Sequence, residues 1–439
     1  MVLIITFVNI LLLYGGTYAF VKKITIGDSR ALTILTSAIS LAVALSFMYY
    51  LMLVLSQSFV VLLTILSAIN LAHIFFTRDF FKNYRPKLLS NSHIWPLAAT
   101  FFLTSYFILY ASKYGSWDAF AMWNLHAKFF YHPELWKHLF TSKLSYSALD
   151  YPMMLPSIVA FFWNAVGSMS PYVPLLFAYG VMLAIPLYTY FALRDEGLKW
   201  LSLVALVIFV TDNNFKQIAT SQCADSLLSL LILMVFVQCE KLKGLINNRA
   251  YLLGFICASC AWVKNEGLVF YLLFTVGFIL SNYRHFPVLK KYFTGAIVPT
   301  IVLASFKLFF APANDLISAD NKQLFSLSVV LTDWSRYATI CKFWLNTLVS
   351  NYIYGLILIF AAFVVNRRFF ASMPAIIIAL MLLGYFIIYL ITPHDLGWHL
   401  YTSLYRVFQH IYPALIYLLL LSFKNIYKSE WSAADSAGI

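Results

Sequence analysis

Apolar segments follow one another along almost the whole chain. Stretches close to the roughly 20 residues that a helix needs to cross a bilayer recur from Met1 to Phe423, separated by short polar or basic segments. Inside hydrocarbon the backbone polar groups must be satisfied internally, and a helix achieves this within one segment. The pattern predicts an all-α, polytopic helical membrane protein and excludes a disordered or all-β chain.

Lysine and arginine mark the expected cytoplasmic side. The positive-inside rule places basic clusters in the cytoplasm, so the chain crosses an even number of times between clusters, which predicts about 13 transmembrane helices. The N-terminus is then outside, and residues 424–439 form a cytoplasmic tail. The clusters are Lys22/Lys23/Arg30, Arg78/Lys82/Arg85/Lys87, Arg194/Lys199, Lys241/Lys243/Arg249, Arg284/Lys290/Lys291, Arg367/Arg368 and Lys424/Lys428.

The same parity predicts where helices pair. Residues 31–76 divide into two helices near 56–58, and residues 201–238 form a pair around the polar stretch 212–225. Residues 251–282 form a helical hairpin with Lys264 to Gly267 at its outer turn. Each pair returns the chain to the basic side, as the rule requires.

Other segments are expected to stay on the outer side. Residues 95–112 run outward, so residues 113–150 lie outside the cytoplasm. Residues 151–166 are short, proline-marked and aromatic, which favours a helix in the outer interface over a crossing. Residues 312–351 are expected to form a second long outer segment.

Composition narrows the class further. Of the 439 residues, 62% are hydrophobic and only 11% are charged, whereas a soluble domain is about a quarter charged. A soluble enzyme is therefore excluded. The 30 Lys and Arg against 17 Asp and Glu give a net charge of +13, which the positive-inside rule explains without nucleic acid as a partner.

Cysteine and histidine patterns do not predict a metal or cofactor. The Cys257 and Cys260 spacing lacks a second pair, and small cysteines pack well between membrane helices. His394, Asp395 and His399 could be read as a metal cluster, but their spacing straddles Gly397 and does not match a helical His pair. We expect no metal site.

Most acidic residues away from the basic clusters fall on the outer side of this topology. An ionisable residue at membrane depth costs roughly 3 kcal/mol, so it normally faces a cavity or a partner. The pattern predicts a polar cavity open to the outer side. These residues are Asp118, Glu134, Asp150, Asp212, Asp225, Glu266, Asp315, Asp320, Asp333 and Asp395.

Asp118 is the first candidate for chemistry. It follows an outward helix directly and opens the amphipathic segment 117–128, which ends at Lys128. The carboxylate could act in catalysis or could cap the interfacial helix. We favour catalysis, because Asp118 occurs together with other outer polar groups, including Asp150 and Tyr151 before a proline-marked helix and Asp225 at the start of another.

Two cations complete the candidate set. Lys264 shares the tip of a hairpin with Glu266, and the two could neutralise one another or act on a ligand. Arg406 begins a spanning segment with no acidic residue within one turn, and its guanidinium fork matches a phosphate. The alternatives for Arg406 are snorkelling to the interface and pairing with a distant carboxylate such as Asp395.

The order of these motifs resembles the GT-C superfamily of integral-membrane glycosyltransferases, especially protein O-mannosyltransferases and lipid A aminoarabinose transferases. In that family a catalytic acid follows an outward helix, as Asp118 does, and a Tyr-Pro-rich segment follows, as at Asp150 to Pro152. An Asp at a helix start, a Lys-containing hairpin tip and a late Arg come later. The resemblance covers residues 95–423 and leaves residues 1–94 as an additional three-helix membrane segment.

The resemblance implies transfer of a sugar from a polyprenyl-phosphate carrier to a lipid, glycan or protein acceptor, with inversion, outside the cytoplasm. It implies Asp118 as the base and Lys264 and Arg406 as donor phosphate ligands. The expected substrate-binding residues are Lys128, Asp150, Tyr151, Asp225, Glu266, Asp395 and His399. Compact loops and the lack of targeting signals favour a bacterial cytoplasmic membrane, with the site on its outer face.

A transporter or lipid flippase is the alternative function. Such proteins often show internal repeats and helices broken at matching positions. No convincing repeat is visible, and the charges gather on one face instead of the midplane. A purely structural assembly protein would leave Asp118, Lys264 and Arg406 without a role.

Overall fold

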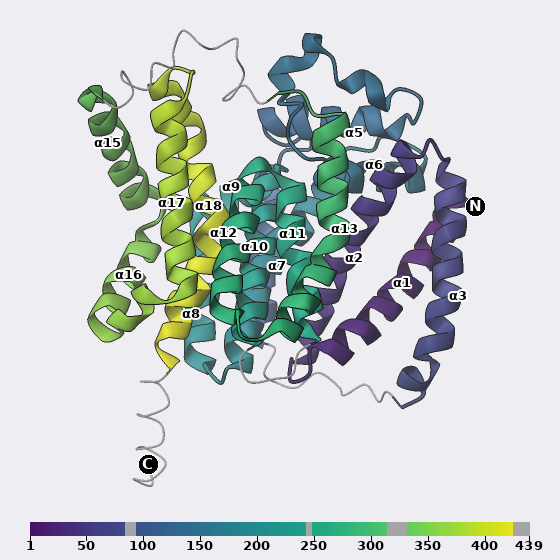
Figure 1. The fold of residues 1–439 in the computed structure, drawn as a ribbon, viewed down its shortest axis with the longest axis horizontal. Helices are drawn as coiled ribbons and strands as arrows, with labels where there is room; N and C mark the ends of the chain where they lie inside the picture. The colour runs from purple at the N-terminus through teal and green to yellow at the C-terminus, as the bar shows by residue number, and fades with distance from the viewer. Residues whose placement is uncertain (84–93, 243–247, 314–331, 425–439) are drawn as a thin grey trace.

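The computed structural model describes residues 1–83, 94–242, 248–313 and 332–424. All regular structure within these ranges is helical, as predicted. The expected residues Asp315 and Asp320 lie outside the described ranges. Figure 1 shows the helices as one bundle in which α10 runs through the centre, and nearly every residue of α10 (Ala224–Glu240) is buried.

The N-terminal helices pack onto the rest of the bundle. They are α1 (Val2–Ile24), α2 (Arg30–Val54) and α3 (Phe59–Asn83), and the division near residue 56 is confirmed. Helix α2 packs against the later helices α6 and α7. Its Tyr49 hydroxyl also donates a hydrogen bond to the carbonyl of Phe130 at 2.8 Å. The segment 1–94 is therefore joined to the part of the chain that carries Asp118.

Short helices cover one end of the bundle, which we call the cavity end. After α4 (Ile94–Tyr110) the chain forms η2 (Ala119–Trp123), α5 (Asn124–Tyr131), η3 (Trp136–Leu139) and η4 (Ser142–Ser147). It then enters α6 (Met154–Val166) and α7 (Tyr172–Asp195). Figure 1 shows this blue segment at the end opposite to the last turn of α18. The amphipathic segment predicted at 117–128 is thus helical.

The central helices reproduce both predicted pairs. They are α8 (Lys199–Thr211), α9 (Asn213–Thr220), α10, α11 (Arg249–Val263), α12 (Asn265–Asn282) and α13 (Phe286–Phe309). Lys264 alone separates α11 from α12, as the hairpin prediction required. Helices α11 and α13 meet at glycines: a Cβ on Gly254 would lie 1.9 Å from the carbonyl oxygen of Tyr292. Such small residues let membrane helices approach closely.

The C-terminal helices are α15 (Trp334–Asn351), α16 (Ile353–Val365), α17 (Met373–Ile391) and α18 (Leu396–Ser422), with the short η6 (Arg367–Ala371) between α16 and α17. Residues 334–351, which were expected to belong to an outer segment, form a regular helix, and its one buried residue in the described part is Ile340. The outer placement stays a prediction. Helix α18 packs along α10 and is mostly buried.

In the described part of the chain, fewer helices are long enough to cross a membrane than the positive-inside rule predicts. Among the described residues, seven helices are long and apolar enough to cross a membrane, or up to nine if each of two bent helix pairs is one span. Five shorter apolar helices add to these. The chain therefore has the architecture of a multi-pass membrane protein, and the count of about 13 stays a prediction.

Described residues from two of the basic clusters gather at the end opposite to the cavity end. A hollow of 620 Å³ there is lined by residues from the α1–α2 turn, the end of α7, both ends of the α10–α11 connection and the end of α18. Lys241, Arg249 and Lys424 are among them. We call this the basic end. Its position agrees with the sidedness that the positive-inside rule predicts.

Candidate functional site

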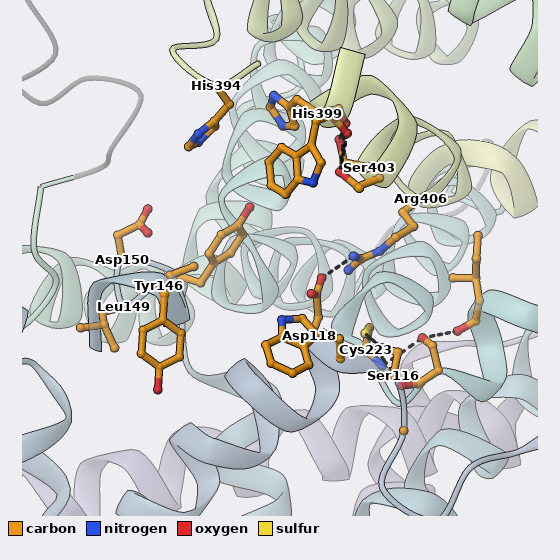
Figure 2. A pocket seen from close by; sticks show the side chains of 18 of the residues that line it. Ser116, Asp118, Tyr146, Leu149, Asp150, Cys223, His394, His399, Ser403 and Arg406 are labelled. Atoms are coloured by element: carbon orange, nitrogen blue, oxygen red, sulfur yellow. Dashed lines mark hydrogen bonds and ion pairs between the residues drawn. The ribbon is translucent and has the colours of Figure 1, made fainter. Parts of the chain in front are cut away.

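A cavity of 1560 Å³ opens at the cavity end. Its walls come from the segment after α4, from η4 and the turn that follows it, from α9 and the turn before α10, and from the start of α18. Figure 2 shows Asp118 and Arg406 pointing toward one another, with Tyr146 and Asp150 on one side and His394 and His399 on another. The sequence predicted a polar cavity, and the structure has a cavity lined by Asp118, Asp150 and Arg406. Its opening to the outer side of the membrane stays a prediction.

Asp225 is the centre of a buried ion cluster behind the cavity wall. Its side chain is only 1% exposed. Lys264 Nζ donates to Oδ1 at 2.8 Å, and His410 Nε2 lies 2.8 Å from the same oxygen. Arg406 Nη2 donates to Oδ2 at 2.8 Å. A carboxylate paired with several donors in this way is stable despite its burial.

Local structure explains why Asp225 sits there. Gln222 has a φ of 62°, and this turn lets the chain bend by 115° between α9 and α10. Asp225 follows in the first turn of α10. An acidic residue in the first turn also interacts favourably with the helix dipole. The broken helix therefore delivers a carboxylate to the place where α11, α12 and α18 meet.

Asp118 is the carboxylate of the cluster that lines the cavity. Its carboxylate forms an ion pair with Arg406 Nη1, and the side chains are 31% and 20% exposed. Asp118 occupies the N-cap position of η2 but makes no capping hydrogen bond with its side chain. Of the two roles considered for Asp118, the capping role therefore has no support in the structure.

Lys264 lies between two carboxylates. Besides Asp225, it approaches Glu266 Oε1 at 3.3 Å, and its side chain is 6% exposed. The Tyr151 ring lies beneath its ammonium at 5.5 Å from the ring centroid, and the Tyr151 hydroxyl donates to Glu266 Oε1 at 3.5 Å. Burial, followed by the nearby Glu266 carboxylate, raises the pKa of the Tyr151 phenol, so this hydroxyl remains a donor.

Asp150 joins the cavity wall to the helices behind it. Asn265 Nδ2 donates to Asp150 Oδ2 at 2.7 Å. Lys307 Nζ donates to the Asp150 carbonyl at 2.6 Å and to Asn265 Oδ1 at 2.7 Å. These bonds hold the end of the 111–153 segment against α12 and α13, and place Tyr151 next to Lys264.

Three other predicted residues lie apart from the ion cluster. Asp395 accepts a hydrogen bond from the Trp398 backbone N–H at 2.7 Å and so caps α18. His399 lines the cavity, and its Nδ1 lies 2.8 Å from Thr392 Oγ1. Lys128 is exposed, does not line the cavity, and lies over the Phe120 ring at 5.3 Å. Within the described ranges, no group of three or more His, Cys, Asp or Glu could hold a metal ion.

Arg406 was interpreted as a phosphate ligand, and the alternatives were snorkelling to the interface or pairing with a distant carboxylate such as Asp395. The structure has the pairing, but with carboxylates other than Asp395. They are Asp118 and Asp225, which lie 288 and 181 residues away in the chain. A search for acidic residues within one helical turn could not find partners this distant.

His410 was missed as a site residue. It is fully buried on α18, between Asp225 and the Tyr385 hydroxyl, which lies 3.3 Å from its Nδ1. The available signal was its spacing: His410 follows Arg406 by four residues, so the two share one face of the helix. A histidine on the same face as an unexplained arginine was a reason to include it.

Among the described residues, the charges of the cluster do not cancel. Three carboxylates, Asp118, Asp225 and Glu266, face two permanent cations, Arg406 and Lys264, which leaves one excess negative charge when His410 is neutral. The arrangement offers the cavity a carboxylate and the end of a guanidinium side by side. Chemically, such a pair can remove a proton from one group while it stabilises negative charge on another.

Comparison with known proteins gives no family assignment: no family model matches the chain, and no curated protein or solved structure matches it significantly.

Proposed function

We propose that the protein is a membrane glycosyltransferase of the GT-C type, which transfers a sugar from a polyprenyl-phosphate carrier to an acceptor, with inversion. The observation that supports this proposal is the Asp118–Arg406 pair at the wall of the cavity, backed by Asp225 and Lys264. The chain brings these residues from separate helices to one point, although burying charges in a membrane protein is costly.

The residues supply the two functions that the reaction needs. The acceptor hydroxyl attacks the anomeric carbon, the bond from that carbon to the phosphate oxygen breaks, and the acceptor proton moves to Asp118. The negative charge that develops on the departing phosphate is stabilised by the Arg406 guanidinium, with Lys264 behind it. A single displacement of this kind inverts the anomeric carbon.

The cavity rim suits a lipid-linked donor. Trp117 and Tyr401 line the cavity and are 76% and 77% exposed. Exposed Trp and Tyr side chains are typical of the membrane interface, where a carrier phosphate resides. The acceptor is a lipid, glycan or protein on the extracytoplasmic side. The basic end, which we assign to the cytoplasm of a bacterial cell, supports this orientation.

The direct test is mass spectrometry of lipid-linked sugars and cell-surface glycans in cells with and without the protein. We expect cells lacking it to accumulate a polyprenyl-phosphate sugar and to lose one glycan modification. A gene copy encoding Glu134→Gln should restore the wild-type profile, because Glu134 is exposed and its described ion pair is with His132 at 3.4 Å. Unchanged lipid-linked sugars and glycans would contradict the proposal.

One observation favours a transporter or lipid flippase as the second candidate. Two helix pairs are sharply bent, α9/α10 by 115° and α15/α16 by 94°, and they are joined by a hydrogen bond from Asn351 Nδ2 to Asn214 Oδ1 at 3.0 Å. Broken helices are common in transporters. Reconstituted protein that moves a lipid-linked sugar across the bilayer without forming a glycosylated product would favour this function.

A further inference from the structure

We propose that Asp118 and the donor phosphate compete for the same face of Arg406, so that the carboxylate is held in an ion pair until the donor binds. This inference rests on the proposed function and concerns the regulation of the same site. It assigns to the Asp118–Arg406 pair the role of a latch that the anionic substrate opens.

Asp225 fixes one edge of the Arg406 guanidinium. Arg406 Nε and Nη2 both donate to Asp225 Oδ2, at 3.3 and 2.8 Å. Asp225 cannot turn away, because its other oxygen receives Lys264 and contacts His410. The edge of Arg406 that is left faces the cavity through Nη1, and Asp118 occupies it.

The two carboxylates differ in how firmly they are held. The side chain of Asp225 is 1% exposed, whereas that of Asp118 is 31% exposed. An ion pair that solvent reaches is weak, whereas a buried, multiply bonded one is costly to break. Asp118 is therefore the exchangeable partner of Arg406, and Asp225 is the permanent one.

A phosphate is suited to replace Asp118. The donor phosphate is a diester with one negative charge, like a carboxylate, and charge-assisted bonds from a guanidinium to its two free oxygens are strong and well oriented. When the phosphate takes Nη1, the Asp118 carboxylate no longer accepts that bond and can accept the acceptor proton. The donor thus binds first and activates the base, which limits proton abstraction to the loaded protein.

The test measures binding of farnesyl phosphate, a short polyprenyl monophosphate without a sugar, to purified full-length protein in nanodiscs. Asp118→Asn removes the competing charge at nearly constant shape, so we expect it to bind the probe about tenfold more tightly than the wild type. Asp118→Glu keeps the competing charge and should bind like the wild type. Thermal unfolding of each variant establishes that the site is folded.

A second control separates competition from a general loss of negative charge. Glu134→Gln removes an exposed carboxylate of the same segment as Asp118, and this carboxylate does not line the cavity and is paired with His132 at 3.4 Å. The affinity of this variant should equal that of the wild type. Equal tightening in Glu134→Gln and Asp118→Asn would overturn the latch.

The remaining outcomes distinguish a failure of the latch proposal from a failure of the glycosyltransferase proposal. If the wild type binds farnesyl phosphate and Asp118→Asn binds it equally or more weakly, the latch is wrong and the glycosyltransferase proposal stands. If neither protein binds the probe, the donor class proposed above is wrong, and the latch fails with it.

Discussion

Two buried ion networks lie at opposite ends of the bundle, and they are built differently. At the basic end, Lys241 Nζ contacts Asp28 at 3.0 Å and Asp195 at 2.8 Å, while Arg249 Nη2 contacts Asp28 at 3.0 Å. These four side chains are at most 10% exposed. At the cavity end, Arg406 and Asp118 are 20% and 31% exposed.

The basic-end network joins helix ends, and its described members are balanced in charge. Two carboxylates face two cations among them, and these residues come from the α1–α2 turn, the end of α7, the residue after α10 and the start of α11. Arg249 also donates to Gln238 at 2.6 Å. A network of this kind orients helices relative to one another. Within the described part of the chain, the cavity-end cluster has one more carboxylate than permanent cations and an exposed side, which suits the ligand site that we propose.

The largest expected effect is a loss of turnover when the cavity-end cluster is changed. Asp118→Asn should lower turnover about 10²- to 10⁴-fold, as loss of a general base does, with thermal stability close to that of the wild type. Glycosyl transfer by purified protein, together with thermal unfolding, measures both. Near-normal turnover of a well-folded Asp118→Asn variant would remove the base assignment and with it the contrast between the ends.

The next largest effect is a loss of stability when the basic-end network is changed. Asp28→Ala leaves Arg249 and Lys241 buried without their shared carboxylate, which should lower the free energy of unfolding by about 3–5 kcal/mol. Denaturant titration in detergent measures it. Turnover per folded molecule should not change, because Asp28 lies at the opposite end from the cavity. A loss of turnover without a loss of stability would show that the basic end takes part in catalysis.

The sequence was sufficient for the elements that carry the cavity-end cluster. The Lys264 hairpin, the start of α10 near Asp225 and the helical segment after Asp118 all follow from apolar length and polar breaks, which are local properties. Sequence alone also selected Asp118, Asp225, Lys264 and Arg406 as candidates. Their convergence in one cluster adds weight to that choice.

Pairing could not be predicted, because it depends on contacts distant in sequence. Lys241 and Arg249 were interpreted only as markers of the cytoplasmic side, yet both are buried against Asp28, more than 200 residues earlier. His410 was overlooked for the same reason. Charge patterns show which side a segment faces, whereas the partner of each charge is set by helix packing.

The third expected effect is a pH dependence of stability that arises from a buried histidine at the cavity end. His126 on α5 is fully buried, with Nε2 at 2.9 Å from both the carbonyl and the hydroxyl oxygen of Ser147. Burial lowers the pKa of His126 from 6.5 to about 4. Between these values the unfolded chain binds a proton that the folded protein excludes, so stability falls as the pH falls from 6.5 to 4.

The loss between pH 7 and pH 5 should be about 2 kcal/mol. Thermal or denaturant unfolding at the two pH values measures it, and His126→Gln should reduce the difference. The basic-end network provides the contrast, since the described members Asp28, Asp195, Lys241 and Arg249 include no histidine. An equal pH dependence in wild type and His126→Gln would contradict this origin.

The smallest expected effect concerns Tyr151 and tests which part of its side chain matters. The hydroxyl bond to Glu266 is long, at 3.5 Å, whereas the ring lies beneath the buried Lys264 ammonium at 5.5 Å. A cation over an aromatic ring gains about 0.5–2 kcal/mol, depending on how far it is desolvated.

Tyr151→Phe keeps the ring and should change turnover less than about threefold, corresponding to well under 1 kcal/mol. Tyr151→Leu removes the ring at similar bulk and should lower turnover about tenfold, through a less well-held Lys264. Equal losses in the two variants would show that the hydroxyl, through Glu266, is the group that positions the cluster.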